Sequence, residues 1–158
     1  MKLLSHFIKA KEKELVKNGI AFRVIGRRED LSPKLQKEIA ALEEKTKGGD
    51  FTLVVALSYG GRDEIVRAAC RFNEEAQKGG ENLEEAFASC LDTAGIPDPD
   101  LIVRTSGELR ISNFLLWQAA YAEFYFTDVL WPDFDKAEFD KAIASFSKRE
   151  RRMGGRLK

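Results

Sequence analysis

The chain has 158 residues and a mass of 17.8 kDa, which is the size of a single domain with a hydrophobic core. Apolar residues make up 44% of the sequence and charged residues 33%, so collagen-like, low-complexity and disordered chains are excluded. Lys plus Arg and Asp plus Glu both number 26, and the formal net charge is zero. No field of the whole molecule therefore attracts nucleic acid, and any anion site must be local.

The cysteines and the lengths of the apolar runs indicate the cellular compartment of the protein. Cys70 and Cys90 stand outside any CxxC or Cys/His cluster, so we expect two reduced, buried thiols rather than a disulfide or a zinc site. The longest apolar run, Phe51–Leu57, is far shorter than the roughly 20 residues of a membrane-spanning helix. Charged residues interrupt the first 18 residues, where a secretory signal needs an apolar stretch. These features predict a cytoplasmic protein.

The first half of the chain alternates expected helices and strands. A helix that ends at Asn18-Gly19 precedes a strand at Ile20–Ile25, and a helix capped by Ser32-Pro33 precedes the apolar strand Phe51–Leu57. An apolar run without alternation suits a parallel strand covered on both faces by helices. A third helix follows Arg62 and is expected to stop at Gly79-Gly80. Helical spacing predicts these buried stripes: Leu4, Phe7, Ile8 and Leu15; Leu35, Ile39 and Leu42; Ile65, Val66, Ala69, Phe72 and Ala76.

The second half continues the same alternation. Capping boxes at Asn82/Glu85 and Asp135/Glu138 predict two helix starts. Between them we expect a strand at Leu101–Val103, followed by a polar loop at Arg104–Ser112. A further helix is expected at Asn113–Ala122 and a last strand at Phe124–Phe126. The predicted buried side chains of these helices are Leu83, Ala86, Phe87 and Leu91; Phe114, Leu115 and Trp117; Phe139, Ile143 and Phe146.

This order predicts one domain over residues 1–158, of the α/β class, with a mainly parallel sheet covered by helices on both faces. Ligands of such sheets normally lie at the carboxyl ends of the strands. Two loops are expected there, Ser58–Arg62 and Arg104–Ser112.

The second of these loops carries the chemistry of a phosphate site. Arg104 and Arg110 provide two planar guanidiniums, and hydroxyl groups and an expected helix start lie within the same ten residues. A diphosphate would suit this set of donors. The alternative is a solvated loop whose arginines pair with Glu108 and with nearby aspartates.

Three further features leave alternatives open. Glu123 lies in an apolar setting, where its carboxylate would hold magnesium together with diphosphate oxygens or form a buried salt bridge with an arginine. The basic tail Arg151–Arg156 would wrap an anion or be merely solvated. His6 is the only histidine and has no partner for nucleophilic catalysis, so histidine chemistry is not expected.

Five stretches together resemble the cis-prenyltransferases, the undecaprenyl diphosphate synthase family. The likeness covers essentially the whole chain, and strings of this length are highly specific. It rests on Ser58–Arg62, Pro97–Glu108, Arg110–Gln118, Ala122–Phe134 and Arg152–Gly154.

The resemblance implies a parallel-sheet homodimer that uses magnesium to condense isopentenyl diphosphate onto an allylic prenyl diphosphate, giving cis-polyprenyl diphosphates. By this likeness Arg104, Arg110 and Ser112 would hold the diphosphate of isopentenyl diphosphate. Glu108 would support the arginines, and Glu123 would act at the magnesium ion. Arg152 and Gly154 would complete the site of the second copy. The resemblance implies no nucleic-acid partner, and a cytoplasmic or membrane-peripheral protein that meets a membrane only through its lipid product.

The sequence also departs from the family pattern. The family's Asp-x-Asn-Gly-Arg-type loop, which binds the allylic diphosphate and provides a magnesium ligand, does not occur here. We therefore expect the C-terminal two-thirds of such an enzyme, without its N-terminal strands and inactive by itself. The alternatives are a non-catalytic partner subunit of a heteromeric enzyme, which retention of Arg104, Arg110 and Glu123 disfavours, and a plain anion- or nucleic-acid-binding module, which the zero net charge disfavours.

Overall fold

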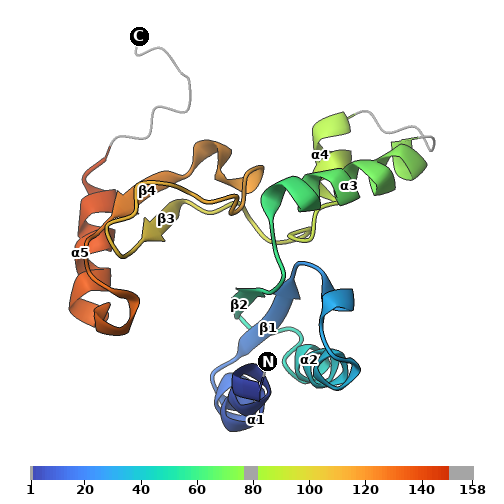
Figure 1. The fold of residues 1–158 in the computed structure, drawn as a ribbon, viewed down its shortest axis with the longest axis horizontal. Coiled ribbons are helices and arrows are strands. Elements are labelled where there is room, and N and C mark those ends of the chain that lie inside the picture. Colours follow the sequence, from blue (N-terminus) through green and yellow to red (C-terminus); the bar gives the residue numbers. More distant parts are fainter. Residues whose placement is uncertain (1, 77–81, 150–158) are drawn as a thin grey trace. The chain divides into compact units, whose positions relative to one another are not determined.

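The computed structural model describes residues 2–76 and 82–149 and consists of two compact units, one up to Ala94 and one from Gly95 (Figure 1). The first unit contains α1 (Lys2–Lys17), β1 (Ile20–Ile25), a 3-10 turn (Arg28–Asp30), α2 (Pro33–Lys45), β2 (Phe51–Ala56), α3 (Gly61–Ala76) and α4 (Leu83–Ala88). The second contains β3 (Leu101–Arg104), a 3-10 turn (Gln118–Tyr121), β4 (Glu123–Phe126), a 3-10 turn (Trp131–Asp133) and α5 (Lys136–Ser147). None of the described helices is both long and apolar enough to cross a membrane.

The α/β class and the parallel direction of the strands are confirmed. β1 pairs with β2, from Ile20 opposite Phe51 to Ile25 opposite Ala56, and β3 pairs with β4. The strands of the described residues form two two-stranded sheets, however, where the sequence predicted one. A local apolar pattern predicts that a segment is a strand, but it does not show which other strand pairs with it.

Capping side chains fix three helix starts as predicted. The Ser32 hydroxyl accepts a hydrogen bond from the Leu35 N–H at 3.4 Å, and Asp135 accepts one from the Glu138 N–H at 3.0 Å. The Asn82 side chain accepts from the N–H groups of Glu84 and Glu85. Each capping side chain accepts from backbone N–H groups that have no partner within the helix. The capping residue and these N–H groups lie within three residues of each other in sequence. Such contacts are therefore readable from sequence.

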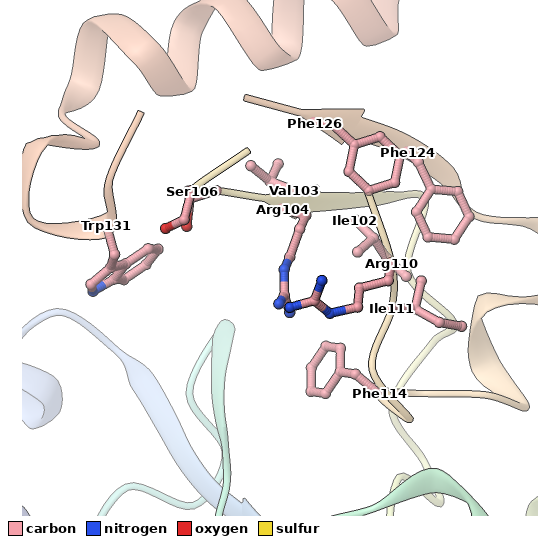
Figure 2. A pocket seen from close by; sticks show the side chains of 11 residues that line it. Ile102, Val103, Arg104, Ser106, Arg110, Ile111, Phe114, Phe124, Phe126 and Trp131 are labelled. Atoms are coloured by element: carbon pink, nitrogen blue, oxygen red, sulfur yellow. The ribbon is translucent and has the colours of Figure 1, made fainter. Parts of the chain in front are cut away.

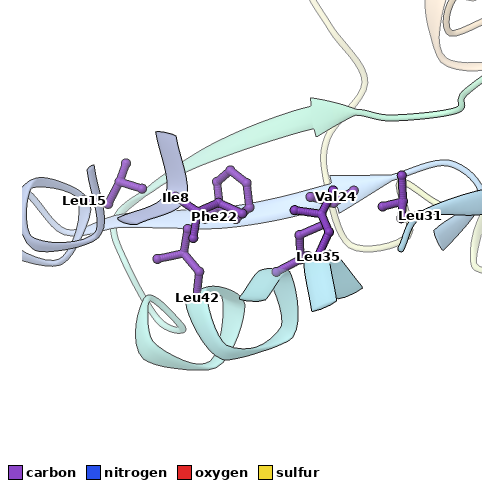
Figure 3. Packing of buried hydrophobic residues seen from close by; sticks show 8 residues of the cluster. Ile8, Leu15, Phe22, Val24, Leu31, Leu35 and Leu42 are labelled. Atoms are coloured by element: carbon purple, nitrogen blue, oxygen red, sulfur yellow. The ribbon is translucent and has the colours of Figure 1, made fainter. Parts of the chain in front are cut away.

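The core of the first unit lies between β1 and the two helices α1 and α2 (Figure 3). Phe22 and Val24 alternate along β1 and point to this core, and Phe22 is only 1% exposed. The predicted stripes of α1 and α2 are confirmed, because Ile8 and Leu15 from α1 and the α2 residues meet Phe22 here: Leu35, Ile39 and Leu42. The opposite side of β1 carries Arg23, whose guanidinium donates to the Ala94 and Asp92 carbonyls at 3.1 and 3.4 Å.

β2 and the outer helix faces are less covered than the sequence predicted. Phe51 in β2 is 71% exposed, and Val66 in α3 is 63% exposed, although both were expected to be buried. Leu83, Phe139 and Ile143 are also exposed, whereas Glu64, Ala68 and Ala142 occupy buried positions of their helices. Cys90 is buried as expected, but Cys70 is exposed. Periodicity identifies an apolar stripe without identifying what covers it. The expected stop at Gly79-Gly80 lies outside the described residues.

The predicted helix over Asn113–Ala122 is wrong. The structure has turns there and only a short 3-10 helix at Gln118–Tyr121. Ser112, Asn113 and Leu115 have φ values of 47°, 64° and 47°, and this left-handed backbone cannot belong to a right-handed helix. The helical spacing of apolar residues in this segment serves another purpose, since Phe114 lines a cavity.

Gly26 holds the ends of β1 and β2 in close contact, and its replacement by alanine is expected to destabilise the protein strongly. Its φ is +103°, and a Cβ atom there would lie 2.1 Å from the Leu57 carbonyl oxygen. The backbone conformation alone costs about 1–3 kcal/mol for a residue with a side chain, and the collision adds to it. Urea unfolding of Gly26→Ala measures the loss. Gly48→Ala is the matched control, because Gly48 has φ +83° but open space around the added Cβ. Equal losses for both variants would contradict the steric argument.

Candidate functional site

The register of β3 and β4 places an arginine and two aromatic rings on one face of the second unit. Ile102 lies opposite Phe124 and Arg104 opposite Phe126, and side chains two residues apart in a strand share a face. The rings of Phe124 and Phe126 are stacked, with their centroids 5.9 Å apart. Arg104 and Phe126 are the last residues of their strands. The shared face therefore ends at the carboxyl edge of the sheet, where α/β proteins bind ligands.

A cavity of about 430 Å³ opens on this face. Figure 2 shows the guanidinium groups of Arg104 and Arg110 converging within it, beside Phe114 and Ile111. The lining combines these two cations with Thr105, Ser106 and an apolar wall of Ile102, Val103, Ile111, Phe114, Phe124, Phe126 and Trp131. The arrangement suits an anion that carries an apolar group.

The backbone after β3 is held in place by the segment after β4. The Thr127 N–H donates to the Arg104 carbonyl at 3.0 Å, and the Ser106 and Gly107 N–H groups donate to the Val129 and Thr127 carbonyls at 2.9 Å. Ser106 and Gly107 both have a φ of 68°, so the chain turns back at this point. This turn returns Arg110 toward the strand that carries Arg104.

The charges in the cavity do not cancel. Arg110 forms an ion pair with Glu108. Among the side chains that the structure describes, Arg104 has no carboxylate partner. Two guanidiniums thus face one carboxylate, and a local excess of positive charge remains. Such an excess favours an anionic ligand.

The other predicted site residues lie elsewhere. Ser112 is the last residue of the Arg104–Ser112 loop but is not among the residues that line the cavity. Glu123 begins β4 opposite Leu101, and its carboxylate accepts a hydrogen bond from Arg149 at 2.7 Å. Strand alternation points Glu123 to the face opposite Phe124 and Arg104. Arg152 and Gly154 lie outside the described residues.

Sequence reasoning missed the aromatic wall of the cavity. Phe114 was expected in a helix core, and Phe124, Phe126 and Trp131 were not singled out. The alternation in β4 could have indicated that Phe124 and Phe126 share a face. The register with β3, which brings this face to Arg104, depends on residues more than 20 positions apart and has no local signal.

The magnesium site implied by the resemblance has a single protein ligand in this chain, Glu123. No group of three or more His, Cys, Asp and Glu side chains that could hold a metal ion occurs in the part of the chain that the structure covers. Glu123, the expected ligand, is ion-paired with Arg149. One carboxylate with diphosphate oxygens and water is enough to hold magnesium, but strand alternation places this carboxylate on the face opposite Arg104. Magnesium therefore stays a prediction of the family resemblance.

The second loop at a strand end, Ser58–Arg62, belongs to the first unit and is surrounded by ion pairs. Arg27 donates to Asp63 through Nε at 3.0 Å and through Nη2 at 2.5 Å, and Arg67 donates to the same carboxylate at 2.9 Å. Arg67 also donates to both carboxylate oxygens of Asp92, at 2.7 and 2.5 Å. Each of these arginines is neutralised by carboxylates, unlike Arg104.

These contacts shift the acid–base equilibria of the cluster. Arg27, and then Arg67, hold the pKa of the Asp63 carboxyl below its ordinary value. Burial raises the pKa of Asp92, but hydrogen bonds and charge from Arg67, with the Gly26 N–H and Arg71, outweigh burial and leave that pKa lowered. The same carboxylates raise the pKa of Arg27 and of Arg67.

Acid is therefore expected to destabilise the protein through these aspartates. Because the folded-state pKa lies below the unfolded one, the unfolded chain binds protons first as the pH falls. The stabilising contribution is present above the ordinary aspartate pKa of about 4 and is lost as the pH falls through the lowered folded values. Urea unfolding at several pH values across this range measures how steeply the free energy of unfolding falls with pH. Asp63→Asn should make the free energy of unfolding depend less on pH. The control is Asp140→Asn, which removes an exposed ion pair with Lys136 on α5 and should leave the pH dependence unchanged. Equal slopes would contradict the assignment.

The fold and the cavity define a class of protein: a parallel α/β protein with a cavity lined by two arginines and an aromatic wall at the strand ends. A family model described as putative undecaprenyl diphosphate synthase matches residues 1–154. The chain belongs to this prenyltransferase family.

Its relatives support the assignment. The chain is 55% identical over 157 residues to an isoprenyl transferase of Fusobacterium nucleatum and covers 66% of that protein. It is 50% identical over 149 residues to an isoprenyl transferase of Thermotoga maritima and covers 64% of it. The chain thus spans about two-thirds of the length of these curated relatives.

Solved structures show the same fold. A probable undecaprenyl diphosphate synthase from Campylobacter jejuni matches 97% of the chain with a TM-score of 0.86 and 41% identity, and the match covers 72% of that protein. Lavandulyl diphosphate synthase from Lavandula x intermedia, solved in complex with dimethylallyl diphosphate, matches 96% of the chain with a TM-score of 0.87 and 36% identity. The match covers 68% of the lavandulyl enzyme.

Proposed function

We propose that the Arg104–Arg110 cavity binds the diphosphate of isopentenyl diphosphate and serves the transfer of its isoprenyl unit onto an allylic prenyl diphosphate. The product would be a cis-polyprenyl diphosphate of the kind used for lipid carriers. The family membership supports isoprenyl transfer in general. The observation that carries the assignment to this cavity is the convergence of two guanidiniums beside an apolar wall.

The residues of the cavity divide the work of binding. The planar forks of Arg104 and Arg110 match paired phosphate oxygens, and Glu108 orients the guanidinium of Arg110. The apolar wall, which includes Phe124 and Phe126, excludes water beside the isoprenyl group. The arginines thereby orient the double bond that attacks the allylic carbon, so that catalysis rests on placement and charge.

Two parts of the proposal depend on the resemblance. Magnesium, where bound, would neutralise charge that develops on the leaving diphosphate. Glu123, the magnesium ligand that the resemblance implies, is ion-paired with Arg149. Arg152 and Gly154 are proposed to complete the diphosphate site of a second copy.

Isothermal calorimetry of the chain with three ligands tests the proposal. We expect isopentenyl diphosphate to bind more tightly than inorganic pyrophosphate, because only the former reaches the apolar wall, and we expect inorganic phosphate to bind weakest. A transfer assay with an allylic diphosphate and magnesium, run beside a longer relative, reports turnover separately from binding. Equal affinity for isopentenyl diphosphate and inorganic phosphate would overturn the assignment. Binding without turnover would favour the partner-subunit alternative.

We further propose that the chain forms a homodimer through the exposed apolar face of α5. Phe139 and Ile143 are one helical turn apart and are 50% and 39% exposed in the single chain. Burial of such a face against a second copy would remove apolar area from water. We expect light scattering to give a dimer, and Phe139→Asp to shift it to monomer. Ala137→Asp on the same helix is the control and should leave the dimer intact. A monomeric parent chain would exclude this interface.

A further inference from the structure

A five-residue strap, Cys90–Ala94, is tied to β1 and α3 by arginines. Arg71 donates to the Cys90 carbonyl through Nε at 2.9 Å and through its second amino group. Arg23 donates to the Ala94 and Asp92 carbonyls. A segment without regular secondary structure is thus held by charge-assisted hydrogen bonds, which are stronger than neutral ones.

Asp92 is the centre of this strap. Its carboxylate accepts hydrogen bonds from both Nη atoms of Arg67 and from the Gly26 N–H, the latter at 3.1 Å. It also accepts a longer hydrogen bond from Arg71, at 3.4 Å. The Gly26 N–H lies at the carboxyl end of β1, where that strand touches Leu57 after β2. One carboxylate therefore joins the end of a strand to the side of α3.

The backbone of Asp92 continues the connection to the loop after β2. The Asp92 N–H donates to Glu64 Oε1 at 2.9 Å, and the Tyr59 hydroxyl donates to Glu64 Oε2 at 2.6 Å. Glu64 is fully buried. A buried carboxylate with well-formed hydrogen bonds tolerates little displacement, because a lost partner leaves its charge uncompensated. The two oxygens of Glu64 thus link the Asp92 backbone to the Tyr59 hydroxyl.

We propose that Asp92 is a positioning residue, which through Glu64 fixes Tyr59 and the Ser58–Arg62 loop at the carboxyl end of β2. Ser58 is held in a left-handed conformation, with a φ of 46°, so the loop does not adopt its shape from local preference alone. This inference goes beyond the proposed function and concerns only the first unit. The position of the loop itself can be tested without any ligand.

The test places 3-fluorotyrosine in the chain and records fluorine spectra together with amide hydrogen exchange. The chain has three tyrosines, and Tyr→Phe variants assign their signals to Tyr59, Tyr121 and Tyr125. In Asp92→Ala we expect the Tyr59 signal to shift and the amides of residues 58–64 to exchange roughly tenfold faster. The signals of Tyr121 and Tyr125 and the exchange of the α2 amides should stay unchanged. Asp140→Ala, which breaks an exposed ion pair with Lys136, is the control.

Asp92→Asn separates geometry from charge and provides a second variant if the alanine protein does not fold. Asparagine keeps one acceptor oxygen, so a smaller shift of the Tyr59 signal than in Asp92→Ala supports the positioning role. An unchanged Tyr59 signal in both variants would overturn it. Joint changes of all three tyrosines and of the α2 amides would also overturn it, because they would show that Asp92 only supports the fold. Failure of pyrophosphate to bind at Arg104 and Arg110 would refute the proposed function and leave this result standing.

Discussion

Replacing Arg104 or Arg110 with alanine is expected to weaken the binding of isopentenyl diphosphate roughly 10- to 100-fold. A hydrogen bond to a charged group contributes about 1.5–3 kcal/mol, and each 1.4 kcal/mol is about tenfold in affinity. Arg104→Lys keeps the charge but loses the planar fork, so its affinity should fall between those of the parent and the alanine variant. Calorimetry at two salt concentrations measures these effects, because part of the attraction is screened by salt.

The control removes an arginine of another kind. Arg28 forms a bidentate pair with Glu43 in the first unit, at 2.8 and 2.5 Å, so Arg28→Ala changes the net charge by the same amount without touching the cavity. Its affinity for isopentenyl diphosphate should match that of the parent. If Arg28→Ala weakens binding as much as Arg104→Ala does, the ligand is responding to overall charge and the cavity is not its site.

Charge pairing distinguishes the two loops at the strand ends. Arg27 and Arg67 beside the Ser58–Arg62 loop are ion-paired with Asp63 and Asp92, so these arginines stabilise the fold of the first unit. In the Arg104–Ser112 loop only Arg110 has a carboxylate partner among the described side chains, and that partner is Glu108. An arginine that is neutralised by its own protein stabilises structure, whereas one that lacks a carboxylate partner remains available for an anion.

The guanidinium pair could be predicted from sequence because Arg104 ends β3 and Arg110 follows that strand within a few residues. The aromatic wall could not, because Phe124 and Phe126 reach Arg104 only through the pairing of β4 with β3. The role of Glu123 was left between a metal ligand and a salt bridge, and the structure has the salt bridge, with Arg149. That partner lies 26 residues away in sequence, at the end of α5, where no local pattern indicates it.

The same division separates the correct and incorrect parts of the predicted fold. The caps at Ser32, Asn82 and Asp135 were predicted because donor and acceptor are neighbours in sequence. The segment after Ser112 has the apolar spacing of a helix, yet left-handed residues break it, and Phe114 lines the cavity. Tertiary contacts override a local helical preference at this point, and such conflicts are most frequent at functional sites.

The largest loss of stability is expected for Phe22→Ala, at about 3–5 kcal/mol in the free energy of unfolding. Phe22 is 1% exposed in the core between β1, α1 and α2, and its truncation leaves a cavity that the rigid strand cannot fill. The Phe22 N–H also donates to the Thr46 hydroxyl at 3.0 Å, a backbone contact that the substitution leaves in place. Urea unfolding therefore measures the lost packing rather than a lost hydrogen bond.

Phe51→Ala is the matched control for this measurement. Phe51 is the same residue type on the paired strand β2, but it is 71% exposed, so its truncation removes little buried area. We expect a change within about 0.5 kcal/mol, as for most surface substitutions. A loss as large as that of Phe22→Ala would show that Phe51 is covered in solution, by a second copy of the chain or by another part of the protein. The covered face of the first unit would then extend from β1 across β2.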